Sequence, residues 1–244
     1  MPLTVSIYDD YNAMSRAAAR AALDTAAKQP EALLSIATGA SPEGLYRYMA
    51  EEKASLQAIR LLKLDEWGGV SREDPSTCET FIREHIIAPW GIEHNLFDGF
   101  DPETTDPMAE CRRIQRRISD MGGIDLAILG MGADGHIGLN YPAADLPAFA
   151  HPTGPETLRH GMLEAALIRP TFGMTLGMAE ILAAREILLV VSGKSKAAAV
   201  ARMLSGRLST EFPASLLLLH GTIHCFLDTD AASLSEETLR GFTM

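Results

Sequence analysis

The length, composition and charge of the chain limit what it can be. Its 244 residues are 47% hydrophobic and carry a formal net charge of −11, which is typical of a globular protein with a full core and excludes a disordered chain. The acidic balance also excludes a general nucleic-acid surface, because binding a phosphate backbone requires clustered Lys and Arg. No apolar run is long enough to span a membrane, and the N-terminal stretch lacks a signal-peptide pattern. We therefore expect one cytoplasmic domain over residues 1–244.

The cysteine pattern gives no sign of a metal site or a disulfide framework. Cys78, Cys111 and Cys225 are odd in number and far apart, and no C-x-x-C pair occurs. His220 and His224 lie near Cys225, but neighbouring side chains of a strand point to opposite faces, so His224 and Cys225 cannot share a metal ion. We predict neither metal ligands nor disulfides.

The first part of the chain alternates predicted strands and helices. Apolar or alternating runs predict strands at 3–7 and 32–37, and an alanine-rich amphipathic stretch predicts a helix over 11–28. The turn Thr38-Gly39-Ala40-Ser41 follows the second strand, and Ser41 is predicted to cap a helix with Pro42 at its first position. Free backbone N–H groups and two hydroxyls then meet at one point. This predicts an anion pocket, with a helix cap that binds no ligand as the alternative.

Two adjacent carboxylates follow the third predicted strand, at 61–64. Asp65 and Glu66 point to opposite sides of an extended chain, so only one of them can face a given pocket. Acidic pairs at strand ends usually cap helices or lie in solvent. The position of Asp65 at the carboxyl edge of the sheet favours instead a role as general base. The next segment, 76–87, is predicted to be a helix capped by Ser76.

The middle of the chain contains a basic helix. A loop is predicted over 93–105, and Asp106-Pro107 is a good helix start. The helix over 108–121 contains four arginines, at positions 112, 113, 116 and 117. Acidic residues flank this run and no aromatic residues interleave with it, so it predicts a solvent-exposed face and not nucleic-acid binding.

The stretch from 124 to 142 carries the most concentrated chemistry. The apolar run 125–129 predicts a buried strand, which ends in a glycine-rich loop containing Asp134, Gly135 and His136. Open α/β folds bind ligands at the carboxyl edge of the sheet, so we place the active site there. The loop also spells G-x-G-x-x-G, but Asn140-Tyr141-Pro142 opposes the helix that a dinucleotide fingerprint requires. A nucleotide cofactor is therefore not expected.

The last part of the chain completes the predicted sheet. A loop or lid is expected over 141–160, a helix over 171–184, and strands over 186–192 and 222–227. The turn Gly193-Lys194-Ser195-Lys196 resembles half of a P-loop, but Leu188 occupies the position of the first glycine. A lysine at a helix start is still a good partner for a phosphate. The whole pattern predicts a doubly wound α/β fold with a mainly parallel, Rossmann-like sheet and helices on both faces.

Four turns occur in a recognisable order: Thr38-Gly39-Ala40-Ser41-Pro42, Leu64-Asp65-Glu66-Trp67, Gly132 to Ile137, and Gly193 to Lys196. In this order the chain resembles the glucosamine-6-phosphate deaminase and 6-phosphogluconolactonase superfamily over nearly its whole length. Asn140 followed by Pro142 is similar to the deaminase branch, whose motif runs D-G-H-I-x-x-N-E-P. The stretches 175–178, 184–191 and 209–215 are similar to proteins called galactosamine-6-phosphate isomerases.

The resemblance implies an enzyme that converts glucosamine 6-phosphate or galactosamine 6-phosphate into a ketose 6-phosphate and ammonia. His136, oriented by Asp134, is expected to open the sugar ring, and Asp65 to move a proton from carbon 2 to carbon 1 through an enolamine. The expected phosphate ligands are Thr38, Gly39, Ser41 and Lys196. Further substrate-binding residues are expected at Ala40, Glu66, Gly135, Tyr141, Arg159 and His160, the last two as candidates for a lid cation. No metal or organic cofactor is implied.

One residue departs from the deaminase pattern. Tyr141 stands where that branch has glutamate, and a tyrosine can hydrogen-bond His136 but cannot stabilise its protonated form by charge. Asp145 is a hypothetical substitute. Two alternatives stay open: a 6-phosphogluconolactonase, in which the Asp-Gly-His loop activates water, and a non-catalytic sugar-phosphate binding protein. The expected partner is the phosphorylated amino sugar, with no nucleic acid or membrane, and the chain is expected to be a monomer or small homo-oligomer.

Overall fold

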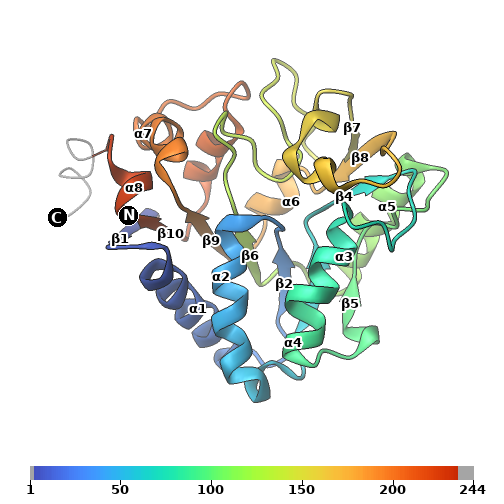
Figure 1. Ribbon diagram of the computed structural model, residues 1–244, viewed down its shortest axis with the longest axis horizontal. Helices are drawn as coiled ribbons and strands as arrows, with labels where there is room; N and C mark the ends of the chain where they lie inside the picture. The colour runs from blue at the N-terminus through green and yellow to red at the C-terminus, as the bar shows by residue number, and fades with distance from the viewer. Residues whose placement is uncertain (1–2, 236–244) are drawn as a thin grey trace.

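A seven-stranded sheet, in which all neighbouring strands are parallel, forms the centre of the fold (Figure 1). The computed structural model describes residues 3–235, with side chains for all of these except residues 53 and 54. The strand order is β1-β10-β9-β6-β2-β3-β5. The bounds are Leu3–Tyr8 for β1, Leu33–Ile36 for β2, Arg60–Lys63 for β3, Phe97–Asp98 for β5, Leu126–Leu129 for β6, Glu186–Val191 for β9 and Ile223–Asp228 for β10. The predicted mainly parallel sheet is confirmed.

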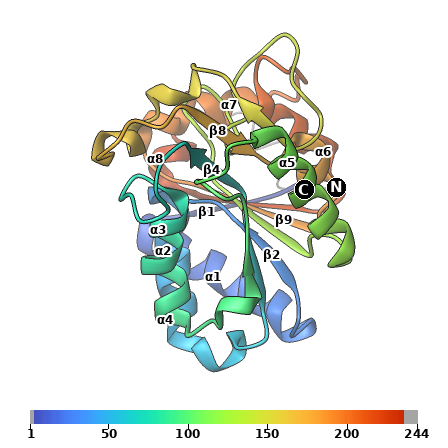
Figure 2. The ribbon, with the colours of Figure 1, turned by 90° about the vertical axis from the view of Figure 1, so that its right-hand side faces the viewer.

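Helices cover both faces of this sheet (Figure 2). One face packs against α1 (Tyr11–Lys28), α2 (Ala40–Met49), α3 (Cys78–Ile82) and α4 (Ala88–Trp90), with a π-helical turn at Arg83–Ile87 and a 3₁₀ segment at Ala50–Leu56. The other face packs against α5 (Pro107–Asp120), α6 (Met178–Leu182), α7 (Ala197–Leu204), α8 (Thr229–Ala232) and a 3₁₀ helix at Pro213–Leu219. Shorter 3₁₀ turns lie at His94–Leu96, Thr157–Arg159, Gly161–Ala165 and Lys194–Lys196. Within residues 3–235, no helix has the length and apolar character needed to cross a membrane.

The central strands are buried on both faces, which explains why they are continuous apolar runs in the sequence. In β6, Leu126 and Ile128 belong to the core beneath α1 and α2, whereas Ala127 and Leu129 belong to the core beneath α5 and α7. The side chains of β2 divide between the two layers in the same way. Alternation along each strand therefore fills two cores at once.

A second, three-stranded antiparallel sheet contains β4 (Asp65–Gly68), β8 (Phe172–Thr175) and β7 (His151–Thr153), in the order β4-β8-β7. The helix predicted over 171–184 is wrong in its first part, since α6 begins only at Met178. Glycines at 173 and 177 disfavour a helix, and 172–175 pairs instead with β4. The loops predicted over 93–105 and 141–160 likewise contain the short strands β5 and β7.

Two predicted helix caps differ from the observed ones. Thr77, and not Ser76, caps α3, with its hydroxyl accepting a hydrogen bond from a backbone N–H of the first turn. Ser76 instead donates both its backbone N–H and its hydroxyl to the carboxylate of Asp74. Gly39 is the N-cap of α2, which has no side-chain cap. The hydroxyl of Ser41 is therefore not used to cap its helix.

The direction in which the chain crosses the sheet reverses between β2 and β6. From β2 the chain runs outward through β3 to β5, and from β6 it runs outward on the other side through β9 to β10. The loops at the carboxyl ends of β2 and β6 therefore diverge, and the crevice between such loops is where open α/β sheets bind ligands. Residues 37–39, which lead into α2, and residues 130–136 form these two loops.

A buried network of charged side chains links the end of β3 to the start of the second sheet. Lys63 is 1% exposed, and its ammonium lies 2.8 Å from Glu66 and 2.6 Å from Glu79. Arg83 donates two further hydrogen bonds to Glu79. The charges compensate one another inside the protein, so removing one partner leaves the others unpaired in a medium that solvates them poorly.

We predict that Lys63→Met lowers the free energy of unfolding by about 3–5 kcal/mol, because the buried Glu66 loses its counter-ion and Glu79 keeps only Arg83. Urea denaturation followed by circular dichroism measures the change. The control is Arg20→Met, which breaks an exposed pair with Asp24 and is expected to cost less than about 1 kcal/mol. Equal losses in the two variants would contradict the role given to the buried network.

Candidate active site

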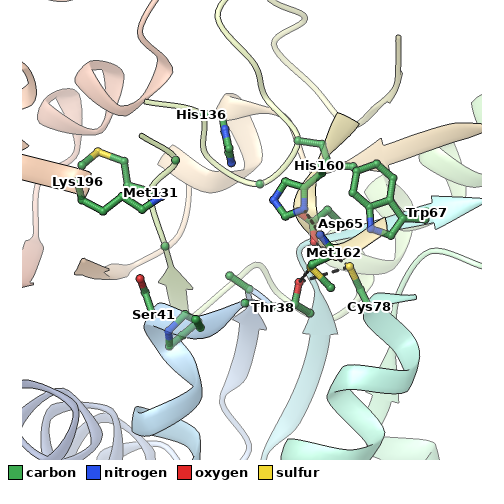
Figure 3. Close-up of a pocket in the computed structure, with 18 residues that line it drawn as sticks. Thr38, Ser41, Asp65, Trp67, Cys78, Met131, His136, His160, Met162 and Lys196 are labelled. Carbon is green, nitrogen blue, oxygen red and sulfur yellow. Dashed lines mark hydrogen bonds between the residues drawn. The ribbon is translucent and has the colours of Figure 1, made fainter. Parts of the chain in front are cut away.

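A cavity of about 300 Å³ lies in the crevice between the β2 and β6 loops (Figure 3). Segments far apart in the sequence meet over it, because the carboxyl ends of parallel strands share one edge of the sheet. The cavity is lined by eight residues predicted for the site: Thr38, Gly39, Ala40, Ser41, Asp65, His136, His160 and Lys196. Five others do not line it: Glu66, Asp134, Gly135, Tyr141 and Arg159.

Ser41 and Lys196 lie on the same side of the cavity and suit an anion (Figure 3). Gly39 has a φ of 103°, in the left-handed region that favours glycine, and the first residues of α2, which follow it, line the cavity. Burial lowers the pKa of Lys196, and Asp134 opposes this change. Among residues 3–235, no side chain pairs with the Lys196 ammonium. A lysine beside a helix N-terminus is a natural phosphate ligand.

Asp65, Trp67 and Cys78 lie on the other side of the cavity (Figure 3). Asp65 and Trp67 share one face of β4, because side chains two positions apart point the same way. Burial raises the pKa of Asp65 to about 7, and the thiol of Cys78, 3.4 Å from Oδ1, opposes this rise. A carboxylate that titrates near neutral pH can both accept a proton and return it.

The imidazole of His136 is held on two sides. Its Nδ1 lies 2.7 Å from Asp134 Oδ1, and its ring stacks on Tyr141 with the centroids 4.4 Å apart. Burial alone would raise the pKa of Asp134, but hydrogen bonds from His136 lower it to about 2. Asp134 is therefore ionised at neutral pH and accepts the proton on Nδ1, which leaves Nε2 free to act on a ligand.

The glycine-rich loop makes room for this Asp-His pair. A Cβ on Gly132 would lie 2.2 Å from His136 Nδ1 and 2.6 Å from Asp134 Oδ1, so only glycine fits there. Gly135 has a φ of 88°, and a Cβ there would collide with the ring of Phe212. No helix begins on these glycines in the described chain. The glycines that spell a dinucleotide fingerprint therefore leave room for the side chains of Asp134 and His136.

The segment after β7 covers the cavity with uncharged groups. The ring centroid of His160 lies 5.8 Å from the ring centroids of both His136 and Trp67. Burial, together with His136 and Lys196 nearby, lowers the pKa of His160 to about 4, so the ring is neutral at pH 7. Arg159 is exposed and lies outside the cavity. Neither candidate for a lid cation therefore places a positive charge in the cavity. Lys196 is the only Lys or Arg that lines the cavity in the described part of the chain.

Glu66 is placed away from the cavity, contrary to the expectation of a substrate contact. Its carboxylate accepts hydrogen bonds from the backbone N–H groups of Trp67, Cys78 and Glu79, and it pairs with Lys63. The physical reason is the alternation along β4: when Asp65 faces the cavity, Glu66 must face the opposite side. Glu66 therefore holds α3 against β4.

Tyr141 and Asp145 do not line the cavity either. The ring of Tyr141 stacks on His136 and packs against the cluster of Trp67, Cys78, Leu139 and Leu163. Asp145 is exposed and lies outside the cavity, so it does not replace the glutamate of the deaminase motif. The position of that glutamate is filled by an aromatic ring that orients the histidine without adding a charge.

Some cavity residues carry no signal in the sequence. Trp67 could be found from its spacing to Asp65, but Cys78 and Met162 come from other elements. The hydroxyl of Thr38 lies 3.5 Å from the sulfur of each of these two residues. Thr38 therefore faces the Asp65 side of the cavity, whereas Ser41 faces Lys196 (Figure 3).

The fold and the cavity together define an α/β protein whose cavity suits an anionic group at one end and proton transfer at the other. A family model described as "Glucosamine-6-phosphate isomerases/6-phosphogluconolactonase" matches residues 9–225. The chain belongs to this family.

Known proteins resemble the chain over most of its length. "Putative deaminase AgaI" of Escherichia coli (strain K12) is 37% identical over 232 residues, which cover 93% of this chain and 92% of that protein. "Glucosamine-6-phosphate deaminase 1" of Bacillus subtilis (strain 168) is 36% identical over 237 residues, covering 92% and 96%. A solved structure of a monomeric glucosamine-6-phosphate deaminase of the NagB superfamily matches with a TM-score of 0.87 at 33% identity, covering 95% of this chain and 99% of that one.

We predict that Lys196→Met weakens the binding of a hexose 6-phosphate about tenfold or more, because the cavity loses its one described cation. Isothermal titration calorimetry measures the dissociation constant. The matched control is Lys194→Met, since Lys194 is exposed, lies two positions away and does not line the cavity. An equal loss in the control would mean that general attraction, and not a contact from Lys196, holds the phosphate.

Proposed function

We propose that the protein is an amino-sugar 6-phosphate deaminase/isomerase, which converts glucosamine 6-phosphate or galactosamine 6-phosphate into a ketose 6-phosphate and ammonia. One observation carries this proposal. Asp65, a buried carboxylate with a pKa of about 7, lines the same cavity as His136, which Asp134 holds, and Lys196, which has no ion-pair partner among the described residues. Deamination needs an anchor for the phosphate, a group that opens the ring and a base for the proton on carbon 2.

His136 is suited to open the pyranose ring. When the bond between carbon 1 and the ring oxygen breaks, the hydroxyl on carbon 1 loses a proton and the ring oxygen gains one. Nε2 of a neutral imidazole can take the first proton and give the second, since Asp134 keeps the other ring proton on Nδ1. The product is an open-chain aldehyde that still carries the amino group on carbon 2.

Asp65 then moves the proton from carbon 2 to carbon 1. Its carboxylate takes the carbon-2 proton, the electrons form a double bond between carbons 1 and 2, and a proton passes from the substrate's ammonium group on carbon 2 to the aldehyde oxygen to give an enolamine. Return of the proton to carbon 1 leaves an iminium at carbon 2. Water adds there and ammonia leaves, which yields the ketose. A pKa near 7 suits Asp65 to both halves of this transfer.

The position of Asp65 favours the deaminase over the two alternatives. Hydrolysis of a lactone needs only an activated water, which His136 could supply, and no proton bound to carbon has to move. A non-catalytic binding protein needs the phosphate end of the cavity but no buried base. The monomer or small homo-oligomer and the cytoplasmic location stay predictions.

We predict that the protein releases ammonia from one or both epimeric amino-sugar phosphates, and that Asp65→Asn lowers kcat by about 10²–10⁴-fold. A coupled ammonia assay on the two substrates in parallel measures this. Because only the ionised carboxylate accepts the proton, kcat/KM should fall as the pH drops below about 7, the pKa of Asp65. The substrate phosphate titrates near pH 6 and adds its own change below that point.

The control for this prediction is Asp145→Asn, which removes an exposed acid outside the cavity and should keep the wild-type rate. Acid release from 6-phosphogluconolactone without ammonia from either amino sugar would replace the deaminase by the lactonase. Tight binding of an amino-sugar phosphate without any product would favour the binding protein.

We predict that Tyr141→Ala lowers kcat by about 2–10-fold, because an aromatic stack worth about 0.5–1.5 kcal/mol no longer orients His136. Tyr141→Phe keeps the ring and should stay close to the wild-type kcat. Steady-state kinetics of the two variants provide the measurement. If Phe and Ala cause the same loss, the hydroxyl and not the stacked ring is what His136 requires.

A further inference from the structure

The thiol of Cys78 contacts both Asp65, the candidate base, and Thr38, in the loop after β2. It is the first residue of α3, is 3% exposed and lines the cavity next to Asp65 (Figure 3). Its Sγ lies 3.4 Å from Asp65 Oδ1 and 3.5 Å from Thr38 Oγ1. Within the described part of the chain, this thiol is the one group that donates a hydrogen bond to the carboxylate of Asp65.

The backbone of Cys78 is fixed by a carboxylate on the far side of β4. Its N–H donates to Glu66 Oε1 over 2.8 Å, and the N–H of Trp67 donates to the same oxygen over 2.8 Å. The other oxygen of Glu66 is held by Lys63. One buried side chain therefore locks the start of α3 to the strand that carries Asp65, so the thiol cannot drift away from the carboxylate.

The chemistry of Cys78 in this position is that of a donor and not of a nucleophile. Burial raises the pKa of the thiol well above its usual value, and the negative charges of Asp65 and Glu66 raise it further. The sulfur therefore keeps its proton at neutral pH. An ionised carboxylate has no proton to give, so the S–H must donate to Asp65.

We propose that Cys78 is a positioning residue for Asp65, whose thiol holds Oδ1 and leaves Oδ2 free for the proton on the substrate carbon. The inference rests on the proposed function, in which Asp65 is the base. A carboxylate held at one oxygen cannot rotate away from the substrate, which matters because a small misplacement of a catalytic group costs much of its rate.

Removing the donor has a defined effect on titration. A hydrogen bond to the charged form of a carboxylate lowers its pKa, so its loss should raise the pKa of Asp65 above about 7. Other ionisable groups interact electrostatically with Asp65 and belong to β3, β4, α2 and the loop after β6: Lys63, Glu66, Tyr46, His136 and Tyr141. None of these is altered by a substitution at position 78, which isolates the contribution of the thiol.

The experiment compares Cys78→Val, Cys78→Ser and the matched control Cys225→Val in the full chain. Valine fills the space of the thiol without a donor, and serine restores a donor. Cys225 lies buried in β10 and has no hydrogen-bond partner for its thiol among residues 3–235. We expect Cys78→Val to move the acid limb of kcat/KM upward by about half a unit to one unit and to lower kcat at pH 7 about 3–10-fold, with KM changed less than twofold. Cys78→Ser and Cys225→Val should keep the wild-type pH profile.

A second readout does not depend on turnover. Titration of the Asp65 carboxyl carbon by ¹³C NMR should show the same upward shift in Cys78→Val and not in Cys225→Val. An unchanged titration in Cys78→Val, or an equal shift in Cys225→Val, would overturn the proposal. If Cys78→Val does not fold, a wild-type profile in Cys78→Ser supports the proposal and an upward shift in it overturns the proposal. A wild-type protein that releases no ammonia would refute the proposed function, and the NMR titration would still decide the role of Cys78.

Discussion

The burial of Asp65 is the constraint on which the site depends. A carboxylate exposed at the edge of a sheet titrates near 3.8, whereas this one is raised to about 7. The second sheet supplies the burial, because β4 carries Asp65 and β8 pairs with it directly, with Thr175 opposite Asp65. His160 and Met162 then cover the cavity from the segment after β7. Without this cover the carboxylate would ionise at acidic pH, and its pKa would not lie near neutral pH.

This burial opposes folding. The pKa of Asp65 is higher in the folded than in the unfolded chain, so the folded protein binds more protons between about pH 4 and 7 and loses stability as the pH rises through that window. A shift from 3.8 to about 7 corresponds to about 4 kcal/mol. Lys63, nearby, stabilises the folded state, because its ammonium compensates two other buried carboxylates and keeps β4 in place. Asp65, whose burial opposes folding, and Glu66, which Lys63 compensates, therefore lie on opposite faces of β4.

The features that local pattern determines could be predicted, and those that depend on distant contacts could not. The parallel strands follow from apolar runs, and the two loops of the crevice follow from where those runs end. The strand at 172–175 exists because it pairs with β4, more than a hundred positions earlier, which a local pattern does not show. Alternation predicts that Asp65 and Glu66 face apart, but only the structure shows Glu66 in a buried ion network. The charge of His160 likewise depends on its burial.

The two ends of the cavity belong to different sheets, so their separation depends on how the sheets are joined. Asn140 provides one joint: its buried amide donates to the carbonyl groups of Ile137 and Leu176, which links the loop of His136 to the chain after β8. The hydroxyl of Thr175 accepts a hydrogen bond from the N–H of Leu139 in the same region. Asn140 therefore ties two segments of the chain together and does not line the cavity. This tie fixes the loop that carries His136 against the end of β8, which pairs with the strand that carries Asp65, and so fixes the two side chains relative to each other.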